Sequence, residues 1–358
     1  MDGRNIVCAG NEQTPRFRPV KYTRRHRFLP LLVAAGCCAA TEANAQWIPP
    51  GAKPDAVVAA DGSGTHKTVQ EAVDAAPEKG GSRFFIQIKA GSYQEKVVVH
   101  ENKGPITLFG EEAKSTVLTY DDFAAKRDEQ GQEIGGTNSY SAKIAADDFA
   151  AENITFANSH WRSGGVGNQA IALSLTADRA SFRKCRIIGK QDTLYVSGGR
   201  QYFEDCYIEG VVDYIFGDGT AFFERCELHC VGKSTFITAA STPREKPVGF
   251  VFSNCKITGK TLEKGKTHLG RTWSPYASVT FLNTEMSEVI RPKGWDNWAN
   301  AENEKTARFA EYKSKGPGAS VQERVRWSRQ LTDEEAAAFS KEKVLGLQSS
   351  EPEMKPGG

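Results

Sequence analysis

The sequence predicts an all-β fold, a parallel β-helix whose short strands stack in successive coils, with short helices at its ends. The pattern Phe-x-x-Cys-x-Ile/Leu starts at Phe182, Phe203, Phe223 and Phe252. Looser copies start at Phe149 and Phe281, so the successive starts are 33, 21, 20, 29 and 29 residues apart. A recurring unit of about 20 residues is typical of a solenoid. The units are rich in β-branched and aromatic residues and several end at glycine, as short strands joined by turns do.

The apolar spacing within each unit changes from three residues to two. Because a strand alternates with a period of two, this change predicts a bend between Phe and Cys, where two faces of the β-helix meet. The cysteines of the pattern would then stack inside the coils, within disulfide reach of one another. We expect them to be mostly free, because a domain of this size has enough core without disulfides. The cysteines that follow residue 45 are Cys185, Cys206, Cys226, Cys230 and Cys255.

Short helices are expected at both ends of the repeat region. Residues 72–76, with Val69 and Val73, suggest a helix that caps the first coil. Thr332 suits the position that precedes a helix, so a second helix is expected after it. Residues 349–358, with two prolines and two terminal glycines, are expected to form a disordered tail.

Asp192 and Asp213 are 21 residues apart, which matches the spacing of the repeat. Residues above one another in adjacent coils lie about 4.8 Å apart, so we expect these carboxylates to be neighbours. Gln169 would continue the column and Gln191 would lie beside Asp192. One interpretation is a structural ladder of polar residues on a solvated face. We prefer an active site, because like charges this close raise one pKa and suit catalysis better than a ladder.

Four segments resemble, in order, the signature motifs of the pectin methylesterases (pectinesterases). They are QAIAL at 169–173, QDTLY at 191–195, DYIFG at 213–217 and LGRTW at 269–273. GSYQE at 91–95, the opening at 61–73 and the segment 289–298 also resemble that family, so the likeness covers roughly residues 55–345. One such motif is weak evidence, whereas several in order are strong. One departure is Thr272, where the family often has proline.

The resemblance implies a right-handed parallel β-helix that hydrolyses the methyl esters on galacturonate units of pectin and releases methanol. It implies that Asp213 is the nucleophile and that Asp192 is first the general acid and then the general base. Arg271 would keep Asp213 ionised and oriented. The alternative is that Arg271 forms an ordinary ion pair at the surface with another acidic residue. The side-chain amides of Gln169 and Gln191 would stabilise the oxyanion.

Aromatic residues near these motifs are candidates for binding the sugar rings. Trp273, Tyr195 and Trp298 would line a groove, because aromatic faces stack on sugars; the alternative is that they fill the core. Thr137, in the Gly-Gly-Thr segment at 135–137, is a further candidate for the groove.

Neither a catalytic triad nor a metal site is evident in the sequence. The six histidines, which we interpret as structural or surface residues, lie at positions 26, 66, 100, 160, 229 and 268. Their spacing fits neither a nucleophile motif nor a set of metal ligands. We therefore expect chemistry without a metal or another cofactor.

Residues 1–45 are predicted to be a signal peptide, with a basic front, an apolar run from Phe28 to Ala40 and a small-residue cleavage site at 43–45. The mature domain would occupy residues 46–348 and be secreted or periplasmic. Lipid anchoring at Cys37 is a minority alternative. The apolar run is too short to span a bilayer.

The formal charge is +2 for the whole chain, with 46 basic and 44 acidic residues. Removing 7 basic and 3 acidic residues with the signal leaves 39 against 41, a charge of −2. A nearly neutral chain gives no electrostatic argument for binding nucleic acid. We expect pectin as the partner and a monomeric enzyme. The rival functions are an esterase or thioesterase of the same fold with another acyl substrate, and a non-catalytic polysaccharide-binding β-helix.

Overall fold

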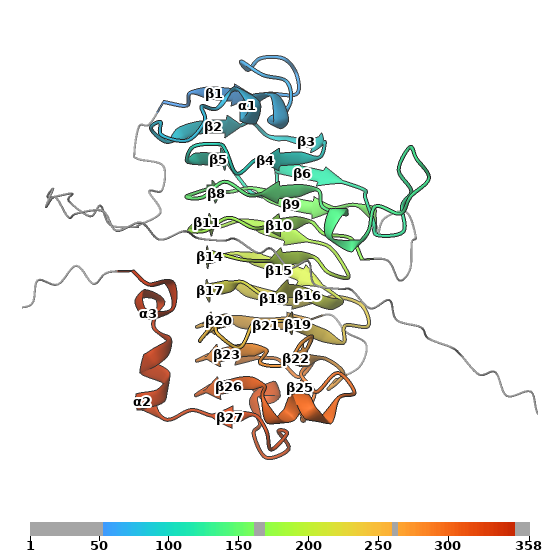
Figure 1. Cartoon of the computed structure of the whole chain (residues 1–358), viewed down its shortest axis with the longest axis vertical. Coiled ribbons are helices and arrows are strands. Elements are labelled where there is room, and N and C mark those ends of the chain that lie inside the picture. Colours follow the sequence, from blue (N-terminus) through green and yellow to red (C-terminus); the bar gives the residue numbers. More distant parts are fainter. Residues whose placement is uncertain (1–52, 161–168, 260–263, 348–358) are drawn as a thin grey trace, which may run out of the picture. The chain divides into compact units, whose positions relative to one another are not determined.

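The computed structural model describes residues 53–160, 169–259 and 264–347. Within these ranges it confirms the predicted parallel β-helix, in which three parallel sheets run along a stack of coils (Figure 1). A typical coil contributes one strand to each sheet in turn, as β14, β15 and β16 do. The predicted signal peptide and C-terminal tail lie outside the described residues.

The first sheet carries the phenylalanines of the repeat. Its strands are β1 (Ala56–Val58), β2 (Phe84–Ile88), β5 (Ile106–Gly110), β8 (Ala150–Glu152), β11 (Ala180–Arg183), β14 (Arg200–Glu204), β17 (Thr220–Glu224), β20 (Phe250–Ser253), β23 (Ser278–Leu282), β26 (Arg308–Tyr312) and β27 (Arg329–Gln330).

The second sheet follows the bend predicted after each phenylalanine. Its strands are β3 (Gly91–Gln94), β6 (Thr116–Tyr120), β9 (Thr155–Asn158), β12 (Arg186–Ile188), β15 (Tyr207–Gly210), β18 (Glu227–Cys230), β21 (Lys256–Gly259) and β24 (Glu285–Met286).

The third sheet completes each coil and carries the candidate site. Its strands are β4 (Val97–Val99), β7 (Ala142–Ile144), β10 (Leu173–Leu175), β13 (Leu194–Val196), β16 (Val212–Gly217), β19 (Phe236–Ala240), β22 (His268–Thr272) and β25 (Trp295–Asp296).

The repeated phenylalanines form a buried ladder, as the sequence pattern predicts. Their rings stack from coil to coil with centroids 4.5–5.0 Å apart, in the order Phe182, Phe203, Phe223, Phe252 and Phe281. The looser copy at Phe149 was aligned incorrectly, because strand pairing places Ala151 rather than Phe149 opposite Phe182. Phe149 and Phe182 are 33 residues apart in sequence, whereas the paired residues Ala151 and Phe182 are 31 apart, a difference of two residues.

The bend between the first and second sheets depends on one residue in a left-handed conformation. At the predicted position, φ is between 50° and 53° in Lys184, Asp205, Arg225 and Asn254. A residue in this region interrupts extended backbone and redirects the chain. The cysteine that follows each of them is buried, and the five cysteines of the described chain are free thiols, as expected.

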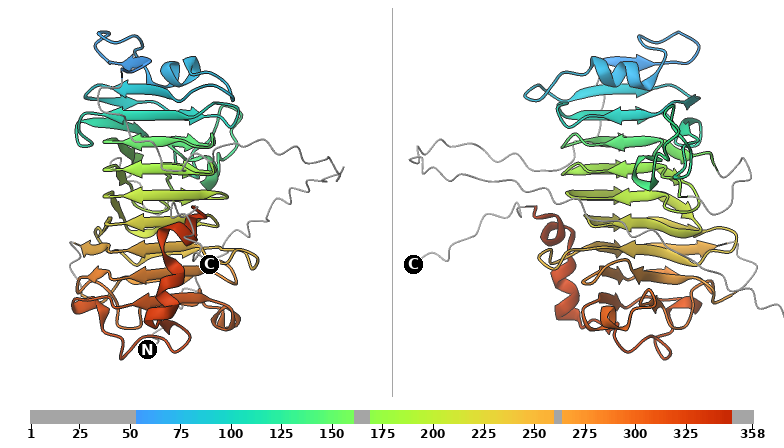
Figure 2. Two further views of the ribbon diagram at one scale, coloured as in Figure 1. Left: turned by 90° about the vertical axis from the view of Figure 1, so that its left-hand side faces the viewer. Right: turned by 45° about the vertical axis from the view of Figure 1, so that its right-hand side comes forward.

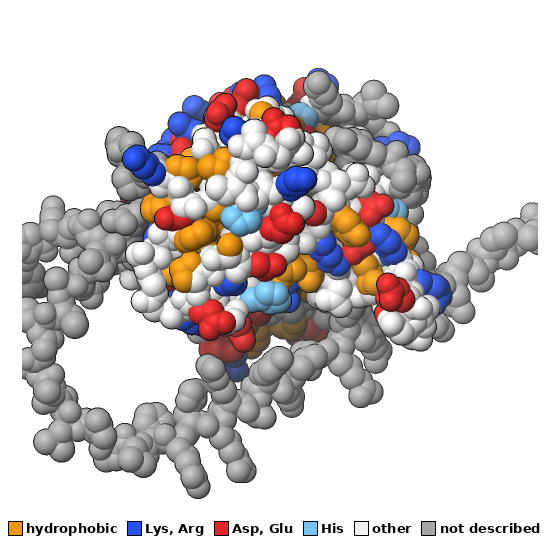
Figure 3. Space-filling model, turned by 90° about the horizontal axis from the view of Figure 1, so that it is seen from above, with side chains coloured by type: hydrophobic (Ala, Val, Ile, Leu, Met, Phe, Trp, Pro, Cys, Tyr) orange, Lys and Arg blue, Asp and Glu red, His pale blue; other side chains and the backbone are white. Residues whose placement is uncertain are grey.

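Helices cover parts of the β-helix. The predicted N-terminal cap is α1 (Val69–Ala75), which begins after a capping box formed by Thr68 and Glu71. Seen from this end, apolar side chains are interspersed with charged and polar ones (Figure 3).

The predicted C-terminal helix is α2 (Asp333–Ala336), whose cap is Thr332, and it is followed by α3 (Lys341–Leu345). Val344 and Leu345 of α3 pack with Phe222 and Val251 on the outer face of the first sheet (Figure 2). The 3-10 turns are η1 (Gly136–Asn138), η3 (Ala301–Lys305), η4 (Pro317–Ala319) and η5 (Ala337–Phe339). No described helix is long and apolar enough to cross a membrane.

Candidate active site

The two predicted carboxylates are adjacent on the third sheet. Leu194 of β13 pairs with Ile215 of β16, and Gln191 bridges to Val212, so Asp192 lies opposite Asp213 in the next coil. Both aspartates have left-handed backbone, with φ of 60° and 50°. Both are buried, with 6% and 5% of their surface exposed. Left-handed backbone interrupts the regular strand here and is common at functional sites.

Gln169 reaches this pair from a position that differs slightly from the predicted column. Leu173 of β10 pairs with Leu194 of β13, a separation of 21 residues, whereas Gln169 precedes Asp192 by 23, so Gln169 is not aligned with Asp192. The Gln169 side chain nevertheless hydrogen-bonds Asp192. Its amide oxygen also faces Gly136, where a Cβ atom would lie 2.8 Å from Oε1. A side chain at position 136 would therefore displace the Gln169 amide from this position.

Arg271 of β22 binds one of the two carboxylates. Its Nε and Nη2 donate to Asp213 Oδ1 and Oδ2 at 2.9 and 2.5 Å, a bidentate geometry that fixes both partners. Its guanidinium packs against two aromatic rings, with Cζ 4.2 Å from the centroid of Phe236 and 3.6 Å from that of Trp298. The predicted Arg271–Asp213 partnership is present, and it is largely shielded from solvent.

His268 of β22 also stacks on Phe236. The two rings are 4.9 Å apart and nearly parallel. Burial lowers the pKa of His268, so the ring is neutral at neutral pH. Arg271 therefore carries the positive charge of the stack.

The two carboxylates differ in their electrostatic surroundings. Burial raises the pKa of Asp192 well above its usual value, and the charge of Asp213 raises it further, against a smaller opposing effect of Gln169. Burial also raises the pKa of Asp213, but the hydrogen bonds and charge of Arg271 oppose that increase. Asp192 is therefore the member of the pair that holds a proton, and Asp213 is the member that ionises first.

Aromatic side chains form a row beside the carboxylates. Tyr195 stacks on Phe216 with centroids 4.8 Å apart, and Phe216 lies 6.0 Å from Trp273. Trp273 is 38% exposed, and it is therefore available to a ligand. Thr137 is exposed on η1, in the segment that contacts Gln169. Tyr195 and Trp273 thus both contact Phe216, Thr137 lies next to the glycine that faces Gln169, and Trp298 lies over Arg271.

Sequence reasoning missed Phe216 and Phe236. Phe216 follows Asp213 by three residues, as Tyr195 follows Asp192, so the repeat offset was a usable signal. Phe236 belongs to no recognised motif; it pairs with His268 in the next strand, and only the fold of the Arg271 side chain brings the two into contact.

Thr272, which departs from the motif, is fully buried, and its hydroxyl accepts a hydrogen bond of 2.8 Å from Asn303 Nδ2. The described residues contain no cluster of three or more His, Cys, Asp or Glu side chains arranged to hold a metal ion.

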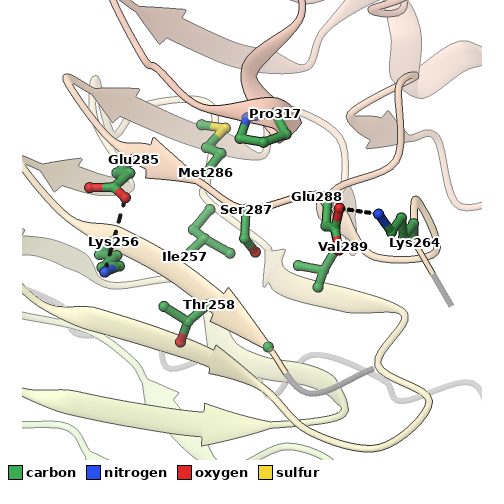
Figure 4. A pocket seen from close by; sticks show the side chains of 11 residues that line it. Lys256, Ile257, Thr258, Lys264, Glu285, Met286, Ser287, Glu288, Val289 and Pro317 are labelled. Carbon is green, nitrogen blue, oxygen red and sulfur yellow. Dashed lines mark ion pairs between the residues drawn. The ribbon is translucent and has the colours of Figure 1, made fainter. Parts of the chain in front are cut away.

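A pocket of about 360 Å³ lies elsewhere, between β21 and β24 on the second sheet (Figure 4). Lys256 forms an ion pair with Glu285 at its edge, and Lys264 forms one with Glu288. Its charges are thus mutually compensated, and it contains none of the candidate site residues.

Solved structures define the class of this protein. The chain is 35% identical to the pectin methylesterase PemA from Erwinia chrysanthemi, with a TM-score of 0.72, covering 82% of this chain and 98% of that one. It is 33% identical to a pectin methylesterase from carrot, with a TM-score of 0.74, covering 82% and 93%. The fold is thus the right-handed parallel β-helix of ester hydrolases that act on a polysaccharide.

The sequence comparisons specify the family. The pectinesterase family profile matches residues 55–348. Pectinesterase 31 from Arabidopsis thaliana is 44% identical over 287 residues, which cover 79% of this chain and 89% of the relative. The chain belongs to the pectinesterase family, as the motifs predict.

Proposed function

We propose that this protein is a secreted pectinesterase that removes methyl esters from galacturonate units of pectin and releases methanol, with Asp213 as nucleophile. The observation that carries this proposal is the unequal environment of the two adjacent carboxylates. Arg271 donates two hydrogen bonds to Asp213, whereas Asp192 is buried beside that charge and forms no ion pair among the described residues. Such a pair suits one nucleophile and one proton donor.

In the first half of the reaction, a carboxylate oxygen of Asp213 attacks the carbonyl carbon of the methyl ester. The carbonyl π electrons move to oxygen, and the proposed role of the Gln169 and Gln191 amides is to donate hydrogen bonds to the oxyanion. When the intermediate collapses, the bond to methoxide breaks and Asp192 gives its proton to the departing oxygen. Methanol leaves, and the galacturonyl group remains joined to Asp213 as an acid anhydride.

In the second half, water attacks the galacturonyl carbon of the anhydride. Asp192 is now ionised and accepts a proton from that water, so it acts first as acid and then as base. The bond to Asp213 breaks, which restores its carboxylate and yields the galacturonic acid unit, which releases its own proton to solvent and becomes galacturonate, while Asp192 keeps the proton that it took from water. Arg271 stabilises the Asp213 carboxylate at both ends of the cycle, because its two donors match the two oxygens.

The substrate is proposed to be a polymer. One structural neighbour is a pectin methylesterase solved in complex with a hexasaccharide, 34% identical to this chain with a TM-score of 0.75. In this chain, Tyr195 and Phe216 stack in adjacent coils, and the exposed Trp273 contacts Phe216 from two coils further along the same sheet; an exposed aromatic ring is suited to stacking on a sugar ring. The segment 1–45 is proposed to direct secretion to where pectin is found.

Methanol release tests the proposal directly. The full chain, incubated with highly methyl-esterified pectin, is expected to release methanol and to generate one carboxylate for each methanol. Binding to pectin without methanol release would instead indicate a non-catalytic polysaccharide-binding β-helix. Hydrolysis of other esters without action on pectin would indicate the rival esterase or thioesterase.

A further inference from the structure

The loop between β25 and η3 places Trp298 directly over Arg271. The Cζ atom of Arg271 lies 3.6 Å from the centroid of the Trp298 ring. Trp298 and the next residue, Ala299, both have left-handed backbone, with φ of 57° and 53°. Bulky residues rarely adopt this conformation, which persists only where surrounding contacts enforce it. The position of Trp298 therefore requires an anchor.

Asn303 provides that anchor. It is 4% exposed, and its Nδ2 donates to Thr272 Oγ1 at 2.8 Å and to the carbonyl of Asn297 at 3.2 Å. The backbone N–H of Trp298 in turn donates to Asp296 Oδ1 at 2.8 Å. One buried amide thus connects the strand that carries Arg271 to the loop that carries Trp298.

The hydrogen bonds of Asn303 bear on the orientation of the Arg271 guanidinium, which the proposed reaction requires. A flexible arginine side chain loses conformational entropy when it is fixed, and the rings of Phe236 and Trp298 both pack against its guanidinium. Removing one ring would let the plane turn and weaken one or both hydrogen bonds to Asp213. A small misplacement of a catalytic group can reduce the rate strongly.

We propose that Thr272 and Asn303 are positioning residues for the reaction: their buried hydrogen bond holds Trp298 over Arg271, which keeps Arg271 bidentate on Asp213. This inference rests on the proposed function for its consequence in catalysis. The Thr272 hydroxyl is the group to test, because it accepts the hydrogen bond from Asn303 and belongs to the residue that follows Arg271.

The variant Thr272→Val tests the inference, because valine has the same shape but no hydroxyl. Its matched control is Thr272→Ser, which retains the hydroxyl. We expect Thr272→Val to lower kcat for methanol release by about tenfold and to move the acid limb of the pH profile to higher pH, since a less firmly held Arg271 leaves the pKa of Asp213 higher. Thr272→Ser should stay close to wild type in both. An unchanged kcat and acid limb in Thr272→Val, with only thermal stability reduced, would show a merely structural role and overturn the inference.

A second measurement is independent of substrate. Hydrogen exchange of the Arg271 Nε–H, assigned in NMR spectra by its loss in Arg271→Lys, reports how firmly the guanidinium is held. We expect exchange about tenfold faster in Thr272→Val than in wild type, with Thr272→Ser unchanged; a tenfold change corresponds to about 1.4 kcal/mol. Equal exchange in all three would overturn the positioning role. If wild type shows a protected Nε–H but no methanol release from pectin, the proposed function fails and the anchor stands.

Discussion

Arg271 and Asp213 are 58 residues apart in sequence, and the guanidinium of the first donates to both carboxylate oxygens of the second at 2.9 and 2.5 Å. The contact depends on the stacking of β16, β19 and β22, which brings three coils side by side. It also distinguishes Asp213 from Asp192, because only one of the two carboxylates receives the cation. The chemical roles assigned to the pair follow from this difference.

Replacing the nucleophile should abolish turnover. Asp213→Ala is expected to reduce methanol release by roughly a thousandfold or more, because no other group in the pair can form the covalent intermediate. The measurement is initial methanol release from esterified pectin. A matched control is Asp205→Ala, which removes another aspartate with left-handed backbone, φ 52°, ion-paired with Arg225 at the bend between the first and second sheets. Retention of more than about a tenth of wild-type turnover in Asp213→Ala would refute the assignment.

Replacing Arg271 by lysine should impair catalysis although the charge is kept. Lysine has no planar guanidinium, so it can neither form the bidentate contact with Asp213 nor stack on Phe236 and Trp298. We therefore expect kcat to fall about a hundredfold. Loss of the bidentate contact also raises the pKa of Asp213, which moves the acid limb of the rate profile to higher pH. A wild-type kcat in Arg271→Lys would show that the bidentate geometry of the Arg271–Asp213 contact is not needed for catalysis.

The pH dependence should report the carboxylate pair. Activity is expected to fall at low pH as Asp213 becomes protonated, and Asp192→Asn should remove the limb due to the second group and most of the turnover. The check is a profile of kcat/KM against pH for both proteins. Full turnover with an unaltered profile in Asp192→Asn would exclude an acid–base role for Asp192.

The same substitution should stabilise the fold at neutral pH. The folded chain raises the pKa of Asp192 above its unfolded value of about 3.9, so the unfolded state releases a proton that the folded state retains. Stability is therefore lost as the pH rises from the unfolded to the folded pKa, and asparagine removes that cost. The unfolding temperature of Asp192→Asn should exceed that of wild type at pH 7, and the difference should vanish below about pH 3.

The sequence predicted the elements whose signal is local or periodic. The phenylalanine ladder and the bend after it were predictable, because one register repeats from Phe182 to Phe281. The pairing of Asp192 with Asp213 followed from the same period. Alignment failed at Phe149 and at Gln169, because in both cases the separation in sequence is two residues longer than the register of the paired strands.

The surroundings of Arg271 were not predictable in the same way. Phe236 and Asn303 reach Arg271 and Thr272 through the third sheet and an irregular loop, and neither belongs to a repeated pattern. Their contacts depend on loop lengths and left-handed residues that only the folded chain reveals. A single sequence gives the period of a solenoid, but it does not show which loop side chains pack against the faces of its sheets.

The final prediction separates pectin from smaller esters. Trp273 is exposed beside Phe216, on which Tyr195 stacks, and a sugar polymer offers rings that can stack on it, whereas a simple ester offers none. Binding energy from such remote contacts can lower the barrier of the chemical step. Methylated galacturonan should therefore have a much higher kcat/KM than methyl acetate or an acyl thioester. Trp273→Ala should lower kcat/KM for the polymer by about tenfold, since stacking on an aromatic ring contributes on the order of 1 kcal/mol, and should leave the value for methyl acetate unchanged. An equal loss of kcat/KM on both substrates would show that Trp273 supports the fold and does not bind the polymer. An acyl thioester with a kcat/KM as high as that of the polymer would favour the rival thioesterase activity.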